Sequence, residues 1–426
     1  MHGVRPAGGT HLHIAAFDMA RDPAGDWWVV SQRTQAPSGL GYLLENRLII
    51  SRMFPEAFGD LKVQRLAASY RALVDGLRAM CPGGNDARVV LLTPGPYNET
   101  YFEHAYLARY LGLTLVEGSD LTVRDQHLYL KTLQGLEPVH GILKRLDDEF
   151  LDPLELRSDS RLGVPGLLQA IRAGNVLVAN APGSAFLEST ALLGFLPALS
   201  RHLLGEELKL PSLATWWCGE RAAMEAVLPQ LGERVIKPTY IAAGPGTVLG
   251  KSLSRREIDE WAGRIVREPD EHTIQAYQPL SQMPTWKNGR IAPRSLMLRV
   301  FAVSDGPQSW RVLPGGLTRI AGQSLDIASM QRGRQQVAGQ ELLGSVHVSH
   351  DAVEQLDALE HAGLDLLPAF GCDDQGKQVQ RPRPLRAVGV RVHVVGDAVV
   401  AHLAAQVDRA AVQVLETVFA KVAKKP

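Results

Sequence analysis

The sequence is poor in cysteine, has no long apolar run and carries no excess of charge of either sign. Its three cysteines, Cys81, Cys218 and Cys372, form no even set and lack the spacing of metal ligands, which predicts free thiols in a reducing compartment. No run of about 18 apolar residues is present, so no membrane-spanning helix is expected, and the N-terminus lacks the order of a signal peptide. Lysine plus arginine and aspartate plus glutamate both number 45, which argues against bulk electrostatic binding to nucleic acid. We therefore expect a cytoplasmic protein, with an enzyme as the leading class and with neither membrane nor nucleic acid as a partner.

Several common catalytic motifs are also missing. The order GxxxxGK[ST] of a Walker loop is absent, as are a GxSxG elbow and a GxGxxG that opens a helix. The histidine pairs His11/His13 and His347/His350 have no further ligands near them, so they predict no zinc site. The function has to be sought in less standard patterns.

The composition is that of a folded chain with more than one domain. A length of 426 residues suits about two or three domains, and 45% apolar with 21% charged residues is ordinary for a globular protein. Apolar runs at 89–92 and 176–179 predict buried parallel strands, with a helix at 99–111 between them. We therefore predict a mainly parallel α/β domain over residues 86–200. Both runs lead into loops of Gly, Pro and polar residues, where ligands bind in open α/β sheets, although ordinary turns have the same composition.

Shorter patterns predict the remaining elements. Strands are expected at 12–17, 27–30, 113–117, 235–236, 273–277, 296–303 and 310–313, helices from 40, at 60–80, near 188 and at 254–268, and turns or linkers at 22–25, 81–86, 205–211 and 314–316. Beyond about residue 333 aromatic residues become sparse, and a polar, Pro-rich stretch at 373–386 predicts weak order, with a helix expected at 403–423.

The strongest local cluster surrounds Lys237. This lysine ends an apolar strand, where burial is expensive without an anionic partner. The Gly-containing loop at 242–250 follows it and can offer backbone N–H groups to phosphates. Taken alone, the pattern fits a surface lysine beside a flexible loop better than a binding site.

Other charged or polar patterns have a structural reading as well as a functional one. Asp18, Arg299 and Arg319 lie in or next to apolar strands, so each is either paired or part of a site. The cluster of charges at 144–148 is more typical of a solvated face. An edge strand at 273–279 would present backbone groups to an adenine ring, although taken alone the segment fits an ordinary strand end better.

Several segments together resemble the circularly permuted ATP-grasp type 2 family, which is related to glutathionylspermidine synthetase. They are 32–39 (QRTQAPSG), 42–47 (YLLENR), 93–110 (TPGPYNETYFEHAYLARY), 152–166 (DPLELRSDSRLGVPG), 210–219 (LPSLATWWCG), 235–238 (VIKP) and 313–319 (LPGGLTR). The resemblance covers about residues 10–332, and its segment at 93–110 is long and specific.

The resemblance implies an α/β (α+β) fold, a circularly permuted ATP-grasp with an inserted Rossmann-like pre-ATP-grasp domain. The first part of the ATP-grasp is then expected at 1–80, the Rossmann-like domain at 86–205, the second part at 211–332 and a divergent tail at 333–426. Family members have a longer leader before the Asp18 strand than this chain has. The oligomeric state stays open.

The resemblance also implies a reaction, its cofactors and a set of site residues. A carboxylate attacks the γ-phosphate of ATP, and an amine then displaces phosphate from the acyl phosphate to form an amide. The cofactors would be ATP and Mg²⁺, and the substrates small-molecule or peptide carboxylates and amines. The residues carried over are Lys237, Gly244, Gly246, Gln275 and Tyr277 for ATP, Arg299, Arg319 and Arg145 for catalysis, Thr93, Asn98, Glu99 and Asn180 for substrate, and Asp18 for the metal.

One departure from the family pattern concerns the metal. Relatives carry E-x-N on the strand after Asp18, where this chain reads Ser31-Gln32-Arg33. Neither Ser nor Gln supplies charge to a hard cation, and alternate strand residues put Arg33 on the face of Ser31. We expect Asp18 and Arg33 within salt-bridge reach, with magnesium entering only with ATP, unless Glu45 or Glu99 substitutes as a ligand. An impaired nucleotide-binding or scaffold protein and a kinase-like phosphotransferase are the alternatives to a ligase.

Overall fold

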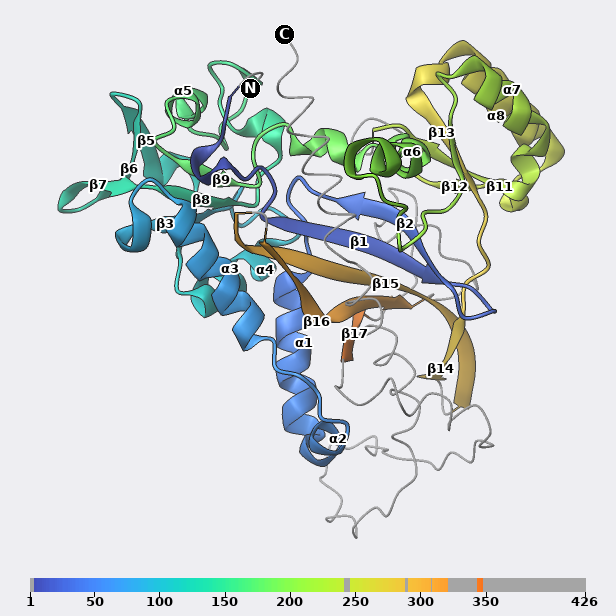
Figure 1. Cartoon of the computed structure of the whole chain (residues 1–426), viewed down its shortest axis with the longest axis horizontal. Coiled ribbons are helices and arrows are strands. Elements are labelled where there is room, and N and C mark those ends of the chain that lie inside the picture. Colours follow the sequence, from blue (N-terminus) through green and yellow to red (C-terminus); the bar gives the residue numbers. More distant parts are fainter. Residues whose placement is uncertain (1–3, 241–245, 288–289, 308, 321–342, 348–426) are drawn as a thin grey trace.

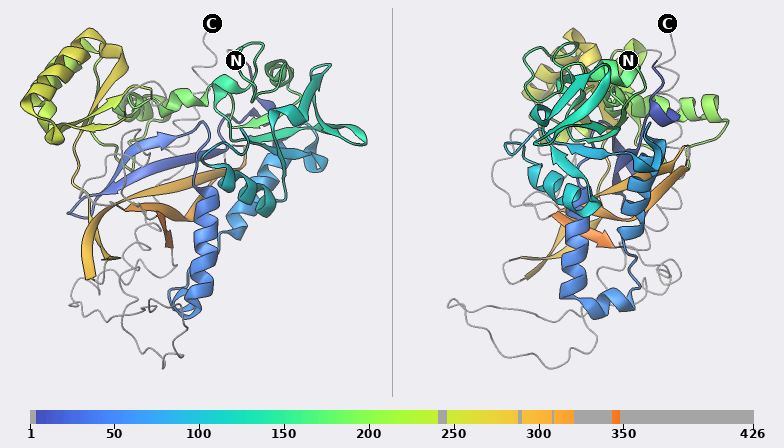
Figure 2. Two further views of the ribbon diagram at one scale, coloured as in Figure 1. Left: turned by 180° about the vertical axis from the view of Figure 1, so that it is seen from behind. Right: turned by 90° about the vertical axis from the view of Figure 1, so that its left-hand side faces the viewer.

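The computed structural model describes residues 4–240, 246–287, 290–307, 309–320 and 343–347. Figures 1 and 2 show three bodies side by side: a central antiparallel sheet, a parallel α/β body at one end and a small sheet with two helices at the other. Gly244 and most of the tail at 333–426, including the stretch expected to be weakly ordered and the helix expected at 403–423, lie outside the described residues.

The central sheet joins strands from the two ends of the described chain. It has the order β17-β16-β15-β1-β2, with β14 paired to β15, and every pairing is antiparallel. Its strands are β1 (Ile14–Arg21), β2 (Trp27–Arg33), β14 (Gln282–Lys287), β15 (Arg290–Gly306), β16 (Ser309–Ile320) and β17 (Leu343–His347). Because β1 lies between β15 and β2, its polar residues meet side chains that are distant in sequence.

Two expectations about this sheet are wrong. The strand expected at 27–30 is too short, because β2 continues to Arg33; Ser31 and Arg33 therefore both lie on paired strand, as expected from the alternation of side chains. The turn expected at 314–316 lies inside β16. Gly316 pairs with Val300, and a Cβ at this position would come within 2.7 Å of the Arg299 carbonyl oxygen. The glycine therefore marks a close approach of two backbones.

Helices α1 (Leu40–Met53) and α3 (Ala67–Met80) pack on one face of the central sheet, and the short helix α2 (Pro55–Asp60) follows at the far end of α1 (Figure 1). The single helix expected at 60–80 is wrong at its start. Lys62 has a φ of 47°, and the left-handed backbone there separates α2 from α3. Within the described ranges, no helix is long and apolar enough to cross a membrane.

The parallel sheet expected within residues 86–200 is present. It has the order β4-β3-β8-β9, with every neighbouring pair parallel. Its elements are β3 (Val89–Leu92), α4 (Tyr101–Leu111), β4 (Thr114–Val116), β8 (Gly141–Lys144), α5 (Leu167–Arg172) and β9 (Leu177–Ala179), followed by α6 (Leu192–Leu204). An antiparallel sheet that the sequence analysis missed interrupts it, formed by β5 (Leu121–Arg124), β6 (His127–Thr132) and β7 (Gly135–Val139).

The third body is a four-stranded antiparallel sheet under two helices. The sheet has the order β10-β13-β11-β12, with strands β10 (Thr215–Trp217), β11 (Arg234–Pro238), β12 (Val248–Leu249) and β13 (His272–Ala276) and helices α7 (Arg221–Val227) and α8 (Arg255–Arg267). Strand β13 lies between β10 and β11, so the edge strand expected here is wrong. Ser254 and Glu257 form a capping box that starts α8 where the sequence placed it.

One apolar cluster crosses the linker expected at 81–86. It contains Ile14 and Phe301 of the central sheet, Leu73 of α3, and Leu91 and Leu143 of the parallel sheet. The first body and the parallel body are therefore packed against each other through a shared core. The predicted domain boundaries stay predictions.

Candidate functional site

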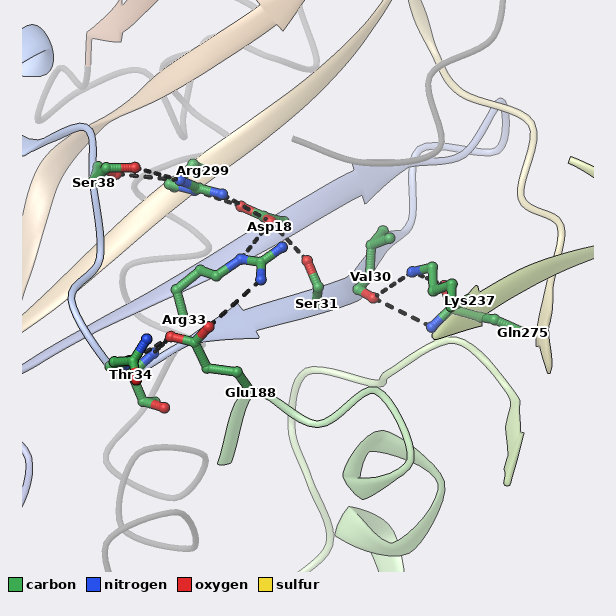
Figure 3. A network of polar contacts seen from close by, with 11 residues as sticks. Asp18, Val30, Ser31, Arg33, Thr34, Ser38, Glu188, Lys237, Gln275 and Arg299 are labelled. Carbon is green, nitrogen blue, oxygen red and sulfur yellow. Dashed lines mark hydrogen bonds and ion pairs between the residues drawn. The ribbon is translucent and has the colours of Figure 1, made fainter. Parts of the chain in front are cut away.

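Strand register brings Asp18 together with Arg299 and Ser31. Asp18 lies in the middle of β1, directly opposite Arg299 on β15 and Ser31 on β2, and paired residues of this kind face each other across the strands. Arg299 donates from Nε to Asp18 Oδ1 at 2.6 Å and from Nη2 to Oδ2 at 3.0 Å. Ser31 Oγ donates to Oδ2 at 2.6 Å. The carboxylate is fully buried, and both of its oxygens have donors (Figure 3).

Arg33 adds a second guanidinium to the same carboxylate. Its Nε lies 3.7 Å from Asp18 Oδ2, and its Nη1 lies 3.6 Å from Glu188 Oε2 (Figure 3). The expected salt-bridge reach between Asp18 and Arg33 is therefore confirmed. Neither Nε nor Nη1 makes a hydrogen bond to any described residue, although Arg33 is only 5% exposed.

Burial by itself would raise the pKa of Asp18, because it disfavours the charged form. The two guanidinium groups of Arg299 and Arg33 and the hydroxyl of Ser31 outweigh this effect and hold the pKa of Asp18 below its ordinary value. Asp18 is therefore an ionised carboxylate at neutral pH.

Glu188 is a site residue that the sequence analysis missed. It ends the short 3₁₀ helix Ser184–Glu188, which follows the last strand of the parallel sheet. Its Oε1 accepts the backbone N–H groups of Thr34 and Gln35, each at 2.7 Å. The parallel body thus holds the end of β2 in place and supplies a counterion to Arg33. No local pattern marks Glu188 for this role.

Lys237 is buried at the same place, so the alternative of a surface lysine is wrong. It lies on β11 and is 4% exposed. Its Nζ donates to the Val30 carbonyl oxygen at 3.2 Å and to Gln275 Oε1 at 2.6 Å, and both acceptors are neutral (Figure 3). Burial, with repulsion from Arg33, lowers the pKa of Lys237 to about 7, although Asp18 opposes the change.

Of the other residues predicted to bind ATP, Gln275 joins the cluster around Lys237. Its Nε2 donates to the Val30 carbonyl oxygen at 3.2 Å and to Thr215 Oγ1 at 3.1 Å. Tyr277, just beyond the end of β13, contacts Lys251, whose Nζ lies 2.7 Å from the hydroxyl and 4.1 Å from the ring centroid. Gly246 is exposed at the start of a described segment.

A second buried ion pair extends the network toward the parallel sheet. Glu103 of α4 accepts the N–H groups of Gly39 and Gly41 at Oε1, at 2.6 and 3.2 Å. Arg145 Nη2 lies 3.9 Å from the same oxygen. Glu103 and Glu188 both raise the pKa of Arg299, though less than Asp18 does and against the opposing effect of burial. Arg145 thus pairs with Glu103, whose charge also favours the charged form of Arg299.

Two signals in the sequence were misread or overlooked here. The solvated face expected at 144–148 is wrong for its two cations, because Lys144 and Arg145 are both buried, whereas Asp147 is exposed. Lys144 Nζ donates to the Gln35 carbonyl oxygen at 2.9 Å and to Asp148. The overlooked signal concerns Glu103. It precedes Leu107 by one helical turn, so the spacing puts both residues on the same, buried face of α4.

The residues predicted to bind substrate mostly make contacts within the fold. Thr93 Oγ1 lies 2.9 Å from His104 Nδ1, and Asn98 Oδ1 accepts from both the backbone and the hydroxyl of Thr100 before α4. Glu99 is exposed. Asn180 has a buried amide that accepts the N–H groups of His13 and Ile14 and donates to two further carbonyl groups. These contacts favour a positioning role for Asn180 over direct contact with substrate.

Arg319 lies on the same face of the central sheet as Arg299. It is opposite Met297, two residues from Arg299 on β15, and it is buried. Its predicted catalytic role stays a prediction.

Comparison with protein families identifies this arrangement. The family model described as circularly permuted ATP-grasp type 2 matches residues 1–321. The chain belongs to this family. Its fold is accordingly a circularly permuted ATP-grasp of mixed α/β type, in which the Asp18 strand precedes the Lys237 strand.

Relatives in the family share more than a third of the aligned residues. Uncharacterized protein Rv2411c of Mycobacterium tuberculosis is 40% identical over 320 residues, which are 75% of this chain and 58% of that protein. Uncharacterized protein sll0335 of Synechocystis is 38% identical over 320 residues, 75% of this chain and 66% of that protein. The chain thus spans about 58% of the length of the Mycobacterium relative.

Among solved structures, a glutathione synthetase-like effector (GSS30) of Globodera pallida in its apo form has a TM-score of 0.49 and 10% identity, with 75% of each chain covered. The ATP-grasp ligase PsnB complexed with a minimal precursor has a TM-score of 0.25 and 13% identity, covering 56% of this chain and 87% of that one. Likeness at this level carries no argument about function.

ATP-grasp proteins typically use ATP with Mg²⁺, and Asp18 is the residue predicted to bind the metal. Both oxygens of Asp18 accept from guanidinium or hydroxyl donors. In the part of the chain that the structure describes, no three His, Cys, Asp or Glu residues form a group that would hold a metal ion. The suggested substitute Glu45 bonds Tyr106, and Glu99 is exposed. The described residues therefore do not fit a magnesium ion held by the protein at Asp18.

Proposed function

We propose that this ATP-grasp protein binds the phosphates of ATP at Lys237 and uses ATP to join a carboxylate to an amine. The observation that carries the proposal is the buried Lys237 ammonium, which has only neutral hydrogen-bond acceptors among the described residues and lies beside Arg33. A buried cation without a paired anion is costly. A bound phosphate would supply the missing anion.

The same cluster has the charge that phosphoryl transfer needs. Positive groups held in a dry site stabilise the charge that develops on the transferred phosphoryl oxygens. In the proposed reaction a substrate carboxylate oxygen forms a bond to the γ-phosphorus, and ADP leaves. An amine nitrogen then attacks the acyl carbon, phosphate leaves, and the amine gives up a proton. Lys237 and Arg33 would hold phosphate oxygens, while Asp18 keeps Arg299 in place.

Release of ADP tests the reaction directly. The protein would be incubated with ATP and a panel of amino acids, peptides and polyamines, and ADP and amide product measured together. We expect ADP release that depends on both an acid and an amine. Equal ADP release with no amine present would argue against amide formation.

A second candidate is a nucleotide-binding protein of the same fold without ligase activity. The observation that favours it is the neutralisation of Asp18 by two guanidinium groups. Nucleotide binding with no ADP release across the whole panel would support this candidate.

The pKa of Lys237 predicts that binding of ATP takes up a proton. Because burial lowers this pKa to about 7 in the free protein, the ammonium is mostly deprotonated at about pH 8. A phosphate beside it favours the charged form, so binding takes up close to one proton at about pH 8, and affinity falls by up to about tenfold per pH unit above pH 7. Calorimetry in two buffers of different ionisation enthalpy measures the uptake.

The variant Lys237→Met has no titrating group at this position and serves as the control for proton uptake. Uptake that is the same in the variant as in the wild type would show that another group is responsible.

A further inference from the structure

The negative charge of Asp18 is already balanced by the guanidinium groups around it. Its Oδ1 accepts from Arg299, and its Oδ2 accepts from Arg299 and Ser31 and also lies 3.7 Å from Arg33 Nε. A divalent cation placed on either oxygen would meet two guanidinium groups at short range. Like charges in a buried site repel strongly.

Arg33, in contrast, has buried N–H donors with no hydrogen-bond acceptor among the described residues. Its Nε and Nη1 make no hydrogen bond to any described residue, and its two carboxylate neighbours lie beyond hydrogen-bond distance, at 3.7 and 3.6 Å. The other oxygen of Glu188, Oε1, already accepts hydrogen bonds from the backbone N–H groups of Thr34 and Gln35. Buried N–H groups of a guanidinium normally find an acceptor. Phosphate oxygens match this donor geometry well.

The charges of the cluster do not cancel. Lys237, Arg33 and Arg299 are cations, and Asp18 and Glu188 are the carboxylates that touch them. Lys237 Nζ bonds the carbonyl oxygen of Val30, and Arg33 lies three positions after Val30 on β2. Repulsion from Arg33 contributes to the lowered pKa of Lys237. When Lys237 is protonated these five groups carry a net positive charge, and Lys237 is the cation whose hydrogen-bond acceptors, Val30 and Gln275, are neutral.

We infer that the Arg33 guanidinium occupies the position of a protein-held metal ion, so that the nucleotide phosphates bind to Arg33 and Lys237 without any divalent cation held by the protein. The inference rests on the proposed binding of ATP at Lys237. A magnesium ion then reaches the site only on phosphate oxygens and water, as that ion often does. The competing explanation is that Arg33 only closes the end of β2 by pairing with Asp18 and Glu188.

Nucleotide binding with and without magnesium tests the inference. Calorimetric titrations of ATP would be carried out in EDTA and in magnesium, and magnesium alone would be titrated into the nucleotide-free protein. The variants are Arg33→Gln and Arg33→Lys, with Arg172→Gln as the control, because Arg172 is an exposed arginine paired with Glu155. Thermal unfolding of each variant checks that it is folded.

We expect wild-type affinities in EDTA and in magnesium to agree within about threefold, with no magnesium binding in the absence of nucleotide. Arg33→Gln should lose about 10-fold to 150-fold in EDTA, the scale of a lost charged hydrogen bond, and less in magnesium, because the ion restores part of the charge. Arg33→Lys should retain most of the affinity and Arg172→Gln all of it.

Two results would overturn the inference in different ways. ATP binding that requires magnesium and is unchanged in folded Arg33→Gln would leave the nucleotide site standing and show that Arg33 is structural. No ATP binding in either condition would overturn the nucleotide site itself, and the inference with it.

Discussion

Replacement of Asp18 by asparagine is expected to lower the free energy of unfolding by about 3–5 kcal/mol, the cost of breaking a buried ion pair by removing one partner. The substitution keeps the size of the side chain, so the loss is one of charge. Arg299 and Arg33 would both stay buried, and Arg299 would keep an acceptor for only one of its two short contacts, because the other oxygen becomes an amide NH₂. Urea unfolding of Asp18→Asn and wild type at neutral pH measures the difference.

The control for this experiment is an ion pair on the surface. Asp159 pairs with Arg157, and both side chains are exposed, so Asp159→Asn should change the free energy of unfolding by less than about 1 kcal/mol. The double variant Asp18→Asn/Arg299→Met should recover part of the loss, because it also removes one of the uncompensated cations. A loss below about 1 kcal/mol for Asp18→Asn would show that the buried pair is not ionised as described.

The same contacts predict how the effect of Asp18→Asn depends on pH. The folded pKa of Asp18 is lowered, so the folded protein releases this proton more readily than the unfolded chain. The contribution of Asp18 to stability is therefore fully present above the unfolded pKa, about 3.9, and is lost as the pH falls through the folded pKa. The difference between variant and wild type should be constant between about pH 5 and 7 and shrink in stronger acid.

Lys237→Met is expected to weaken ATP binding by about 1.5–3 kcal/mol, the scale of a lost hydrogen bond to a charged group. Methionine fills much of the volume of the lysine stem, so the surrounding strands need not move. Removal of a buried ammonium whose pKa is lowered to about 7 should leave stability unchanged or raise it. Calorimetry measures the affinity, and urea unfolding measures the stability.

Lys131→Met is the matched control for this variant. Lys131 is exposed on β6 and bonds the Ser119 carbonyl oxygen, so its loss should leave ATP affinity unchanged. Equal affinities for Lys237→Met and wild type, with both proteins folded, would contradict the assignment of Lys237 to the nucleotide.

Local patterns predicted much of the architecture. The apolar run at 89–92 and the Gly/Pro-containing loop after it identified a buried parallel strand, which β3 confirms. The helix expected at 254–268 matches α8, whose first turn Ser254 and Glu257 cap. These features depend on residues within a few positions of each other, so spacing along the chain is enough to read them.

Local patterns failed where burial depends on distant segments. The charges at 144–148 look like a solvated face, yet Lys144 is buried because Gln35 and Asp148 surround its ammonium. Pro314-Gly315-Gly316 looks like a turn, yet it lies inside β16, and Gly316 allows β15 and β16 to approach closely. A pattern of residue types describes what a segment is able to form, and its neighbours in space decide which form is stable.

By itself the sequence determined the family, the order of the permuted parts, Lys237 as a candidate for the nucleotide site and the pairing of Asp18 with Arg33. The alternation of side chains along one strand was sufficient for the last of these. Only the tertiary structure decided that Arg299 is the closer partner of Asp18 and that Glu103 and Glu188 complete the network. Asp18 and Arg299 are 281 positions apart, and the register that places them opposite each other is set by the packing of whole strands, which no local spacing encodes.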